Sequence, residues 1–407
     1  MCRSTITVHN SIYPRKKMKN PICSTSSDED EYENSAGLEP YCWWRSSAEK
    51  FKLECAMLKL YNNLPNVAGL TPRLRVLREL ERLALVANEG INDFRQKLVT
   101  YRSGDFWMPT GGVPKEKTDI PPVITILLVG FSGSGKSSLV NLMYCVLGRS
   151  GLVPFAQTSS GNSPDYTSMF LEEHNVLRSL RSGFCVYDSR GFDYEQMSEN
   201  IEELSSWMND GVHHNQLCLR SGDYLLRKDE IEVLMSRSSS KFERRRVNCA
   251  MVVANIAEIY KAYKAGNYKP MDAIKELYSS PAFKKCIESP ILILTHGDML
   301  STEERIEGRI KISEWLNISE TSGVYDIVCL TEYGFIAEDS DPVSAYALTE
   351  AIYRALIISD RTHLPKRSFL DWTILVLSWV MCFIAAFFAF LSEICSKLSN
   401  SGGKLKL

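Results

Sequence analysis

The stretch ITILLVGFSGSGKSSLVNLMY, Ile124–Tyr144, decides the fold of this 407-residue chain. An apolar run leads into a turn rich in glycine and serine, and a helix-like pattern follows. Gly130, Gly135, Lys136 and Ser137 complete the pattern G-x-x-x-x-G-K-[ST]. Between a strand and a helix this pattern predicts a phosphate-binding loop, because its backbone N–H groups converge on phosphate oxygens. Kinases, ATPases and GTPases all carry such a loop, so it predicts a bound nucleotide without naming one.

Each residue type in this loop has a chemical role. Glycines allow the tight turns, some with positive φ, that aim successive N–H groups inward. Lys136, the predicted catalytic residue, places an ammonium group against the β- and γ-phosphates, and Ser137 offers a hydroxyl to Mg²⁺. The N-terminal end of the following helix adds positive charge. The predicted nucleotide-binding residues of the loop are Gly130, Ser132, Gly133, Ser134, Gly135, Lys136, Ser137 and Ser138.

A second motif lies about 50 residues further along, in FCVYDSRGF, Phe184–Phe192. Asp188 ends an apolar run and Gly191 follows three residues later, which fits the pattern D-x-x-G. In that pattern the carboxylate holds Mg²⁺ through water and the glycine N–H reaches the γ-phosphate. The next residue is Phe192, where Ras-like enzymes place the glutamine that orients the attacking water. We therefore expect slow hydrolysis, or a water positioned by another group.

A threonine between these two motifs is expected to complete the Mg²⁺ shell. The segment PFAQTSSGNSPDYTSMF, Pro154–Phe170, offers Thr158 and Thr167. Thr158 is favoured because it stands in a segment rich in serine and glycine. The predicted metal ligands are therefore Ser137, Asp188 and Thr158.

A third motif, in PILILTHGD (Pro290–Asp298), indicates which base is bound. Thr295, His296 and Asp298 resemble the [NT]-K-x-D motif of GTPases with histidine in place of lysine. A carboxylate can accept hydrogen bonds from both N1–H and the 2-amino group of guanine, and adenine offers no such donor pair. The imidazole can stack on the base plane. The later segment Cys329–Gly334, CLTEYG, is a looser match to a loop that touches guanine.

The motifs G-F-S-G-S-G-K-S, D-S-R-G-F and T-H-G-D, in this order, resemble the translation-factor-type (TRAFAC) class of P-loop GTPases. The T-H-x-D form and a C-terminal apolar segment are similar to the septin-like group that includes the chloroplast Toc GTPases and the immunity-associated GTPases. The resemblance covers roughly residues 123–334. It implies GTP or GDP with Mg²⁺ as cofactors. It also implies a homodimer across the nucleotide face, which could supply the function missing at Phe192.

The rest of the chain alternates short apolar runs with helical patterns, which predicts an α/β P-loop fold (a G-domain) with a mostly parallel sheet and helices on both faces. We expect a disordered segment at 1–40, a helical N-terminal region at 41–107 starting a helix at Thr71-Pro72, and a linker at 108–122. The GTP-binding domain is expected at 123–360, with a polar insertion at about 208–246. The predicted strands are Val123–Val129, Gly183–Asp188, Val247–Asn255, Pro290–Thr295 and Tyr325–Thr331.

The amino-acid composition indicates which classes of partner and which compartment to expect. A formal net charge of -2 argues against a general nucleic-acid binder, which needs a concentrated excess of Lys and Arg. The 12 cysteines include no C-x-x-C pair and are expected to be reduced thiols in the cytosol.

The segment WTILVLSWVMCFIAAFFAFL, Trp372–Leu391, is apolar apart from Thr373 and Ser378. Twenty helical residues at about 1.5 Å each span a hydrocarbon core of roughly 30 Å. Since only the short tail 392–407 follows, we expect a tail anchor inserted after synthesis, with the bulk of the chain in the cytosol. An organelle outer membrane and the endoplasmic reticulum both accept such anchors.

Together these features predict a membrane-anchored guanine-nucleotide-binding protein, a Mg²⁺-dependent GTPase that acts as a switch. Two alternatives stay open at this stage. One is a GTP-bound membrane scaffold without turnover, and the other is an ATPase or another P-loop nucleotide hydrolase.

Overall fold

A computed structural model describes residues 41–45, 70–109, 114–148, 156, 169–177, 182–221, 223, 242–286, 289–329, 341–363 and 369–402. The described strands form one seven-stranded sheet in the order β4-β2-β3-β1-β5-β6-β7. β1 pairs in parallel with β3 and β5, β5 with β6, and β6 with β7, whereas β2 runs antiparallel to both β3 and β4. The strands are β1 Ile124–Val129, β2 Phe170–His174, β3 Phe184–Asp188, β4 Gln216–Leu217, β5 Cys249–Asn255, β6 Ile291–Thr295 and β7 Val324–Asp326. The predicted α/β fold with a mostly parallel sheet is confirmed.

The central strands β1, β3 and β6 are buried at every residue. Burial on both faces explains why these strands are mostly apolar without alternation, the pattern that made their prediction from the sequence possible. The prediction missed β2 and β4. β2 has the sequence FLEEH, and its charged residues do not match the apolar pattern used to predict strands. β4 has only two residues and lies in the segment expected to be an insertion without a strand. β7 is also shorter than predicted, since it ends at Asp326.

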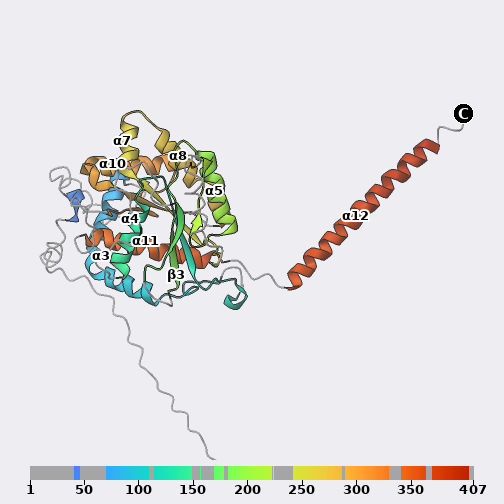
Figure 1. Cartoon of the computed structure of the whole chain (residues 1–407), viewed down its shortest axis with the longest axis horizontal. Coiled ribbons are helices and arrows are strands. Elements are labelled where there is room, and N and C mark those ends of the chain that lie inside the picture. Colours follow the sequence, from blue (N-terminus) through green and yellow to red (C-terminus); the bar gives the residue numbers. More distant parts are fainter. Residues whose placement is uncertain are drawn as a thin grey trace, which may run out of the picture.

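Helices cover both faces of this sheet (Figure 1). On one face, α3, α4 and α11 pack against alternate strand residues such as Ile126 and Val186. On the other face, α5, α7, α8 and α9 pack against the intervening residues such as Leu127 and Tyr187, and α10 contributes to both cores. The helices are α3 Pro72–Thr100, α4 Lys136–Gly148, α5 Met197–Asp210, α7 Ile256–Lys264, α8 Lys269–Tyr278, α9 Pro281–Cys286, α10 Thr302–Leu316 and α11 Pro342–Arg361, with 3-10 turns η2 Trp43–Arg45, η4 Lys115–Lys117 and η6 Gly297–Met299.

The N-terminal helix α3 belongs to the same core as α11. It begins as the sequence predicts, with the Thr71 hydroxyl accepting a hydrogen bond from the Leu74 N–H at 3.4 Å. Further along, the ring of Phe94 lies 5.3 Å from that of Tyr346 between centroids. A Cβ added at Gly90 would lie only 2.6 Å from Tyr346 Cε2, so the two helices approach closely at this glycine. Region 41–107 thus includes a helix packed directly on the body that contains the sheet.

Several predicted features lie outside the described residues. They are the disordered segment 1–40, both threonine candidates Thr158 and Thr167, residues 224–241 of the predicted insertion, and the part of CLTEYG beyond Cys329. The division of the chain into domains stays a prediction.

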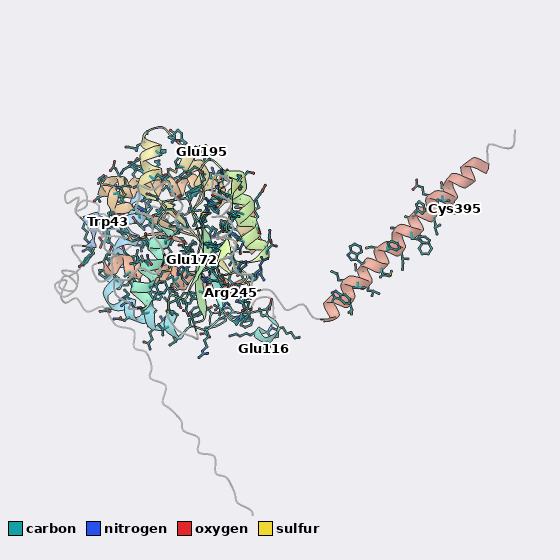
Figure 2. All side chains as sticks on the ribbon, viewed as in Figure 1. Trp43, Glu116, Glu172, Glu195, Arg245 and Cys395 are labelled. Carbon is teal, nitrogen blue, oxygen red and sulfur yellow. The ribbon has the colours of Figure 1, made fainter. Side chains whose placement is uncertain are left out.

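Helix α12, Phe369–Gly402, contains the predicted apolar segment and continues past Leu391. Within the described part of the chain it is the one helix long and apolar enough to cross a membrane, over Trp372–Ser396. None of its most apolar window is buried against the rest of the protein. Figure 2 shows its side chains, Cys395 among them, standing clear of the globular part. By length and composition alone, such an apolar helix could cross a membrane.

Candidate nucleotide-binding site

The candidate site lies at the carboxyl edge of the parallel strands. The chain passes from β1 to β3 on one side and later to β5 on the other, so the sheet order reverses next to β1. In open α/β sheets, the crevice at such a reversal is where ligands bind. The phosphate-binding loop follows β1 directly, Asp188 ends β3 and Thr295 ends β6. Parallel pairing therefore gathers three motifs that are far apart in the sequence.

The loop between β1 and α4 has the backbone that its glycines predict. Gly133 and Gly135 have φ values of 73° and 86°, in the left-handed region that side chains disfavour. A Cβ at Gly130 would lie 2.2 Å from the carbonyl oxygen of Val253 in β5, so no other residue fits there. The first turn of α4 begins at Lys136 and directs its N–H groups toward the loop. These features form a cradle for phosphate oxygens.

The Lys136 side chain is buried inside this cradle. Its Nζ donates to the carbonyl oxygens of Gly130 at 3.1 Å and Phe131 at 3.2 Å. Burial lowers the pKa of the ammonium group to about 8, against the opposing attraction of the Asp188 carboxylate. Because water solvates this ammonium group poorly, a bound anion would stabilise its charged form more strongly than it would stabilise an exposed ammonium group. Lys136 is therefore placed to bind phosphate.

Ser137 and Asp188 meet at the front of the loop. The Ser137 hydroxyl donates to Asp188 Oδ2 at 2.5 Å, and Asp188 Oδ1 is buried without a hydrogen-bond partner among the described residues. Burial raises the pKa of the Asp188 carboxyl, and the Lys136 ammonium opposes the shift. The described residues contain no cluster of three or more His, Cys, Asp or Glu side chains that could hold a metal.

Mg²⁺ nevertheless fits these residues. It binds commonly through one or two protein oxygens, with water and phosphate oxygens filling the other positions. A serine hydroxyl beside a carboxylate with one unused oxygen supplies that donor set. Ser137 and Asp188 would hold the ion, whose charge would neutralise the phosphates, while the third predicted ligand, Thr158, lies outside the described residues.

The D-x-x-G turn touches the phosphate-binding loop. A Cβ at Gly191 would lie 2.7 Å from Ser132 Cα, so the two backbones are too close for any side chain there. The Ser132 N–H donates a hydrogen bond to the Phe192 carbonyl oxygen at 2.9 Å. The Phe192 N–H donates in turn to the Gly130 carbonyl oxygen at 3.0 Å. The two loops are thus joined through their backbones, with Gly191 at the point of closest approach.

Phe192 itself belongs to the core and not to the site surface. Its side chain is 1% exposed and stacks on Trp207 with ring centroids 5.7 Å apart, while the Phe131 ring stands 6.4 Å away. The position thus lacks a water-orienting group for two reasons, the residue type and the direction of the side chain.

The substitution Phe192→Gln tests this placement. Because the side chain packs in an apolar core, an amide there loses aromatic contacts and leaves polar atoms without partners. We expect a loss of about 3–5 kcal/mol in the free energy of unfolding and no gain in hydrolysis rate. Chemical denaturation and phosphate release measure the two effects. A faster and equally stable variant would show that position 192 faces the phosphates, and Phe192→Leu serves as the apolar control.

The T-H-G-D turn packs against the other side of the phosphate-binding loop. The Thr295 hydroxyl donates to the Ser134 carbonyl oxygen at 2.7 Å, and a Cβ at Gly135 would lie 3.2 Å from His296 Cε1. His296 adopts a left-handed backbone with φ 58°, and Asp298, in the 3-10 turn that follows, is exposed. Burial, with the Asp298 carboxylate adding to it, raises the pKa of Cys329 to about 12. Cys329, the last described residue after β7, is thus near enough to Asp298 to be influenced by its charge.

Sequence reasoning missed two arginines that support these turns. Arg305 forms two hydrogen bonds of 2.7 Å to Asp326, and a Cβ at Gly297 would lie 2.3 Å from its Nε, so its side chain backs the T-H-G-D turn. The guanidinium also lies 3.9 Å from the ring centre of Trp43, which stands at the edge of the body in Figure 2. No local sequence motif indicates that Arg305 contacts these residues.

Arg220 supports the D-x-x-G turn from the segment expected to be an insertion. Its side chain donates to the Gly191 carbonyl oxygen at 2.6 Å and to Glu203 at 2.9 Å, and it lies 5.2 Å from the centre of the Phe192 ring. Arg190 beside it donates to the Cys218 carbonyl oxygen at 2.7 Å. The start of the polar stretch is therefore packed on the candidate site, and no sequence motif signals this contact.

No protein-family model matches the chain, and no curated protein matches it. Solved structures do. One, described as a probable GTP-binding protein engB, has 15% sequence identity, covers 57% of this chain and 98% of its own, and gives a TM-score of 0.32. Another, the signal recognition particle receptor SRb-GTP/SRX complex from Chaetomium thermophilum, has 13% identity, covers 51% of this chain and 94% of its own, and gives a TM-score of 0.26. At TM-scores this low neither likeness carries weight, and the fold class rests on the sheet order described above.

Proposed function

We propose that the protein is a membrane-anchored guanine-nucleotide-binding protein, a Mg²⁺-dependent GTPase that acts as a switch with slow intrinsic hydrolysis. The hydrogen bond from Thr295 to the Ser134 carbonyl oxygen carries the proposal. It fixes the T-H-G-D turn to the phosphate-binding loop, so one nucleotide can meet both. A kinase or ATPase needs the loop but has no use for a guanine-selective carboxylate at that place. The order of the motifs resembles the TRAFAC class, and the T-H-x-D form with the C-terminal apolar segment resembles its septin-like branch.

Phosphate recognition falls to Lys136, the backbone N–H groups of residues 130–138 and the Gly191 N–H. Ser137 and Asp188 would hold the metal ion, and Thr158 is the proposed third ligand. The Gly191 turn is bonded through its backbone to the phosphate-binding loop and through its carbonyl oxygen to Arg220. Gain or loss of the γ-phosphate contact at Gly191 can therefore be transmitted to the segment that carries Arg220, as a switch requires.

Base recognition falls to Asp298 and His296. The Asp298 carboxylate is exposed, so its two oxygens can accept hydrogen bonds from the two guanine donors. Burial lowers the pKa of His296, so its imidazole is neutral at pH 7 and can lie against the base without charge. GTP and GDP are the proposed ligands.

A non-hydrolysing, GTP-bound scaffold at a membrane is the second candidate. The observation that favours it is the burial of Phe192 in the core, which leaves the position after Gly191 without a polar side chain. A homodimer across the nucleotide face would restore a water-orienting group from the partner copy. Rapid turnover that depends on protein concentration would support the dimer, and tight binding without turnover would support the scaffold.

We further propose that α12 anchors the chain in a membrane in a single pass, with residues before Asp371 in the cytosol. An organelle outer membrane or the endoplasmic reticulum is the proposed location. We do not propose a nucleic acid as a partner. The exposed apolar surface of α12 supports the anchor, since such a surface is costly in water.

Nucleotide titration of the full chain in vesicles tests the proposed function. We expect GTP and GDP to bind at least about 100-fold more tightly than ATP, because adenine leaves the Asp298 carboxylate unpaired. Chelation of Mg²⁺ should weaken GTP binding. Fluorescent nucleotide analogues report affinity, and phosphate release reports turnover. Equal binding of ATP and GTP would overturn guanine recognition and favour a general P-loop nucleotide hydrolase.

A further inference from the structure

A second site lies at the opposite, amino edge of the sheet. A cavity of about 400 Å³ opens between the residues that enter β6 and β7 and the last turns of α11. Ser289 precedes β6, and Ser322 and Gly323 precede β7, whereas the phosphate-binding loop follows β1 at the far end of the same parallel strands. One strand length of about 15 Å therefore separates this cavity from the nucleotide site.

The cavity is positively charged. Its lining includes Arg354 and Arg361 and no aspartate or glutamate. Neither arginine forms an ion pair with any residue that the structure describes. Arg354 is held in place because its Nη2 donates to Ser322 Oγ at 3.1 Å. The two guanidinium groups lie on one side of α11, since seven positions make nearly two full helical turns.

Two arginines, serine hydroxyls and a loop backbone are the groups that bind a phosphate. Guanidinium groups match phosphate oxygens in pairs, and hydroxyl and N–H donors complete the coordination of the anion. The walls are also partly apolar, because Ile357 and Ile358 lie between the arginines on α11. A ligand that joins a phosphate to apolar material suits this combination better than a fully hydrated anion does.

The position of α11 relative to the membrane segment points to the source of such a ligand. Arg361 ends α11 at the amino edge of the sheet, and the apolar span begins at Trp372, eleven positions later. Eleven residues reach at most about 40 Å when fully extended. The intervening sequence contains Lys366 and Arg367, which add positive charge on the same side of the span.

We propose that this cavity binds the phosphate of an anionic lipid headgroup. Binding there holds the amino edge of the sheet against the bilayer and turns the nucleotide site at the carboxyl edge toward the cytosol. The proposal rests on the membrane anchoring proposed above but not on guanine binding. It assigns a role to two arginines that the nucleotide site does not use.

Hydrogen exchange of the full chain in vesicles tests the proposal. The vesicles contain either phosphatidylcholine alone or three parts phosphatidylcholine to one part phosphatidylserine. We expect the amides of residues 289, 291 and 320–325 to exchange several-fold more slowly in the anionic vesicles, and R354Q/R361Q to abolish the difference. The single variant R361Q, at an exposed helix end, should reduce it without affecting folding. The control R78Q/K261Q, which removes two exposed cations elsewhere, should retain it.

Three results would overturn the proposal. The first is equal exchange in neutral and anionic vesicles, the second is protection that survives in R354Q/R361Q, and the third is full protection by inorganic phosphate. Inorganic phosphate added to neutral vesicles distinguishes the sources, because full protection there would assign the cavity to a soluble phosphate and reject the lipid. Flotation of the vesicles is measured first. A chain that fails to float lacks the anchor, whereas a chain that floats without selective protection lacks only the headgroup site.

Discussion

Replacement of Lys136 by alanine is expected to weaken triphosphate binding by at least about 100-fold and to remove phosphate release. The Lys136 ammonium group is buried, and its two partners are the carbonyl oxygens of the loop itself. No other lysine or arginine belongs to residues 130–138, so the phosphates lose their direct cationic contact there. Titration with a fluorescent GTP analogue and an assay of phosphate release give the two measurements.

Stability without nucleotide separates this effect from misfolding. Burial lowers the pKa of Lys136 to about 8, so the folded protein pays a desolvation cost to keep this group charged at pH 7. Alanine removes that cost, and a protonated Asp188 can balance the missing charge. We expect an unfolding temperature equal to or above that of the unaltered protein. Binding and turnover that stay within twofold would reject Lys136 as the phosphate-binding residue.

Replacement of Asp298 by asparagine is expected to change base preference from guanine to xanthine. In the proposed complex the carboxylate would accept two hydrogen bonds from guanine, each worth about 1.5–3 kcal/mol when one partner is charged. An asparagine amide presents a donor where guanine also presents one, so affinity for GTP should fall by about 100-fold or more. Xanthine carries an oxygen at the position of the guanine amine and accepts that donor. Competition of GTP and xanthosine triphosphate for one labelled nucleotide gives the ratio.

The control Asp119→Asn removes an exposed carboxylate ahead of β1 and should leave both affinities unchanged. Because Asp298 is exposed, its substitution should not affect folding, and circular dichroism checks this. GTP affinity that is unaltered in Asp298→Asn would reject base recognition by the T-H-G-D turn. That result would not contradict the phosphate-binding role proposed for Lys136.

The parallel strands and the phosphate-binding loop could be predicted from short patterns in the amino-acid sequence. The runs that became β1, β3 and β6 are mostly apolar without alternation, since both faces of each strand are covered. Glycine at 133 and 135 predicted positive φ, and Thr71 with Pro72 predicted the start of α3. In each case the physical cause acts within a few residues, so it leaves its mark in the sequence.

The supports of the candidate site could not be predicted in this way. β2 and β4 were missed because a strand with charged residues and a strand of two residues are stabilised by pairing, not by their own composition. Arg220 and Arg305 contact turns that lie far from them in the sequence, and a buried guanidinium looks like any other arginine until its partners are known.

The sequence by itself determined the chemistry available to this protein: a phosphate-binding loop, a D-x-x-G turn, a T-H-G-D turn and one apolar segment. Only the tertiary structure decided that these turns meet, that Phe192 points into the core, and that Arg354 and Arg361 share a cavity at the far edge of the sheet. The reason is physical. Backbone conformation and burial depend on neighbouring residues, whereas a site depends on which distant segments parallel strand pairing brings to the same edge.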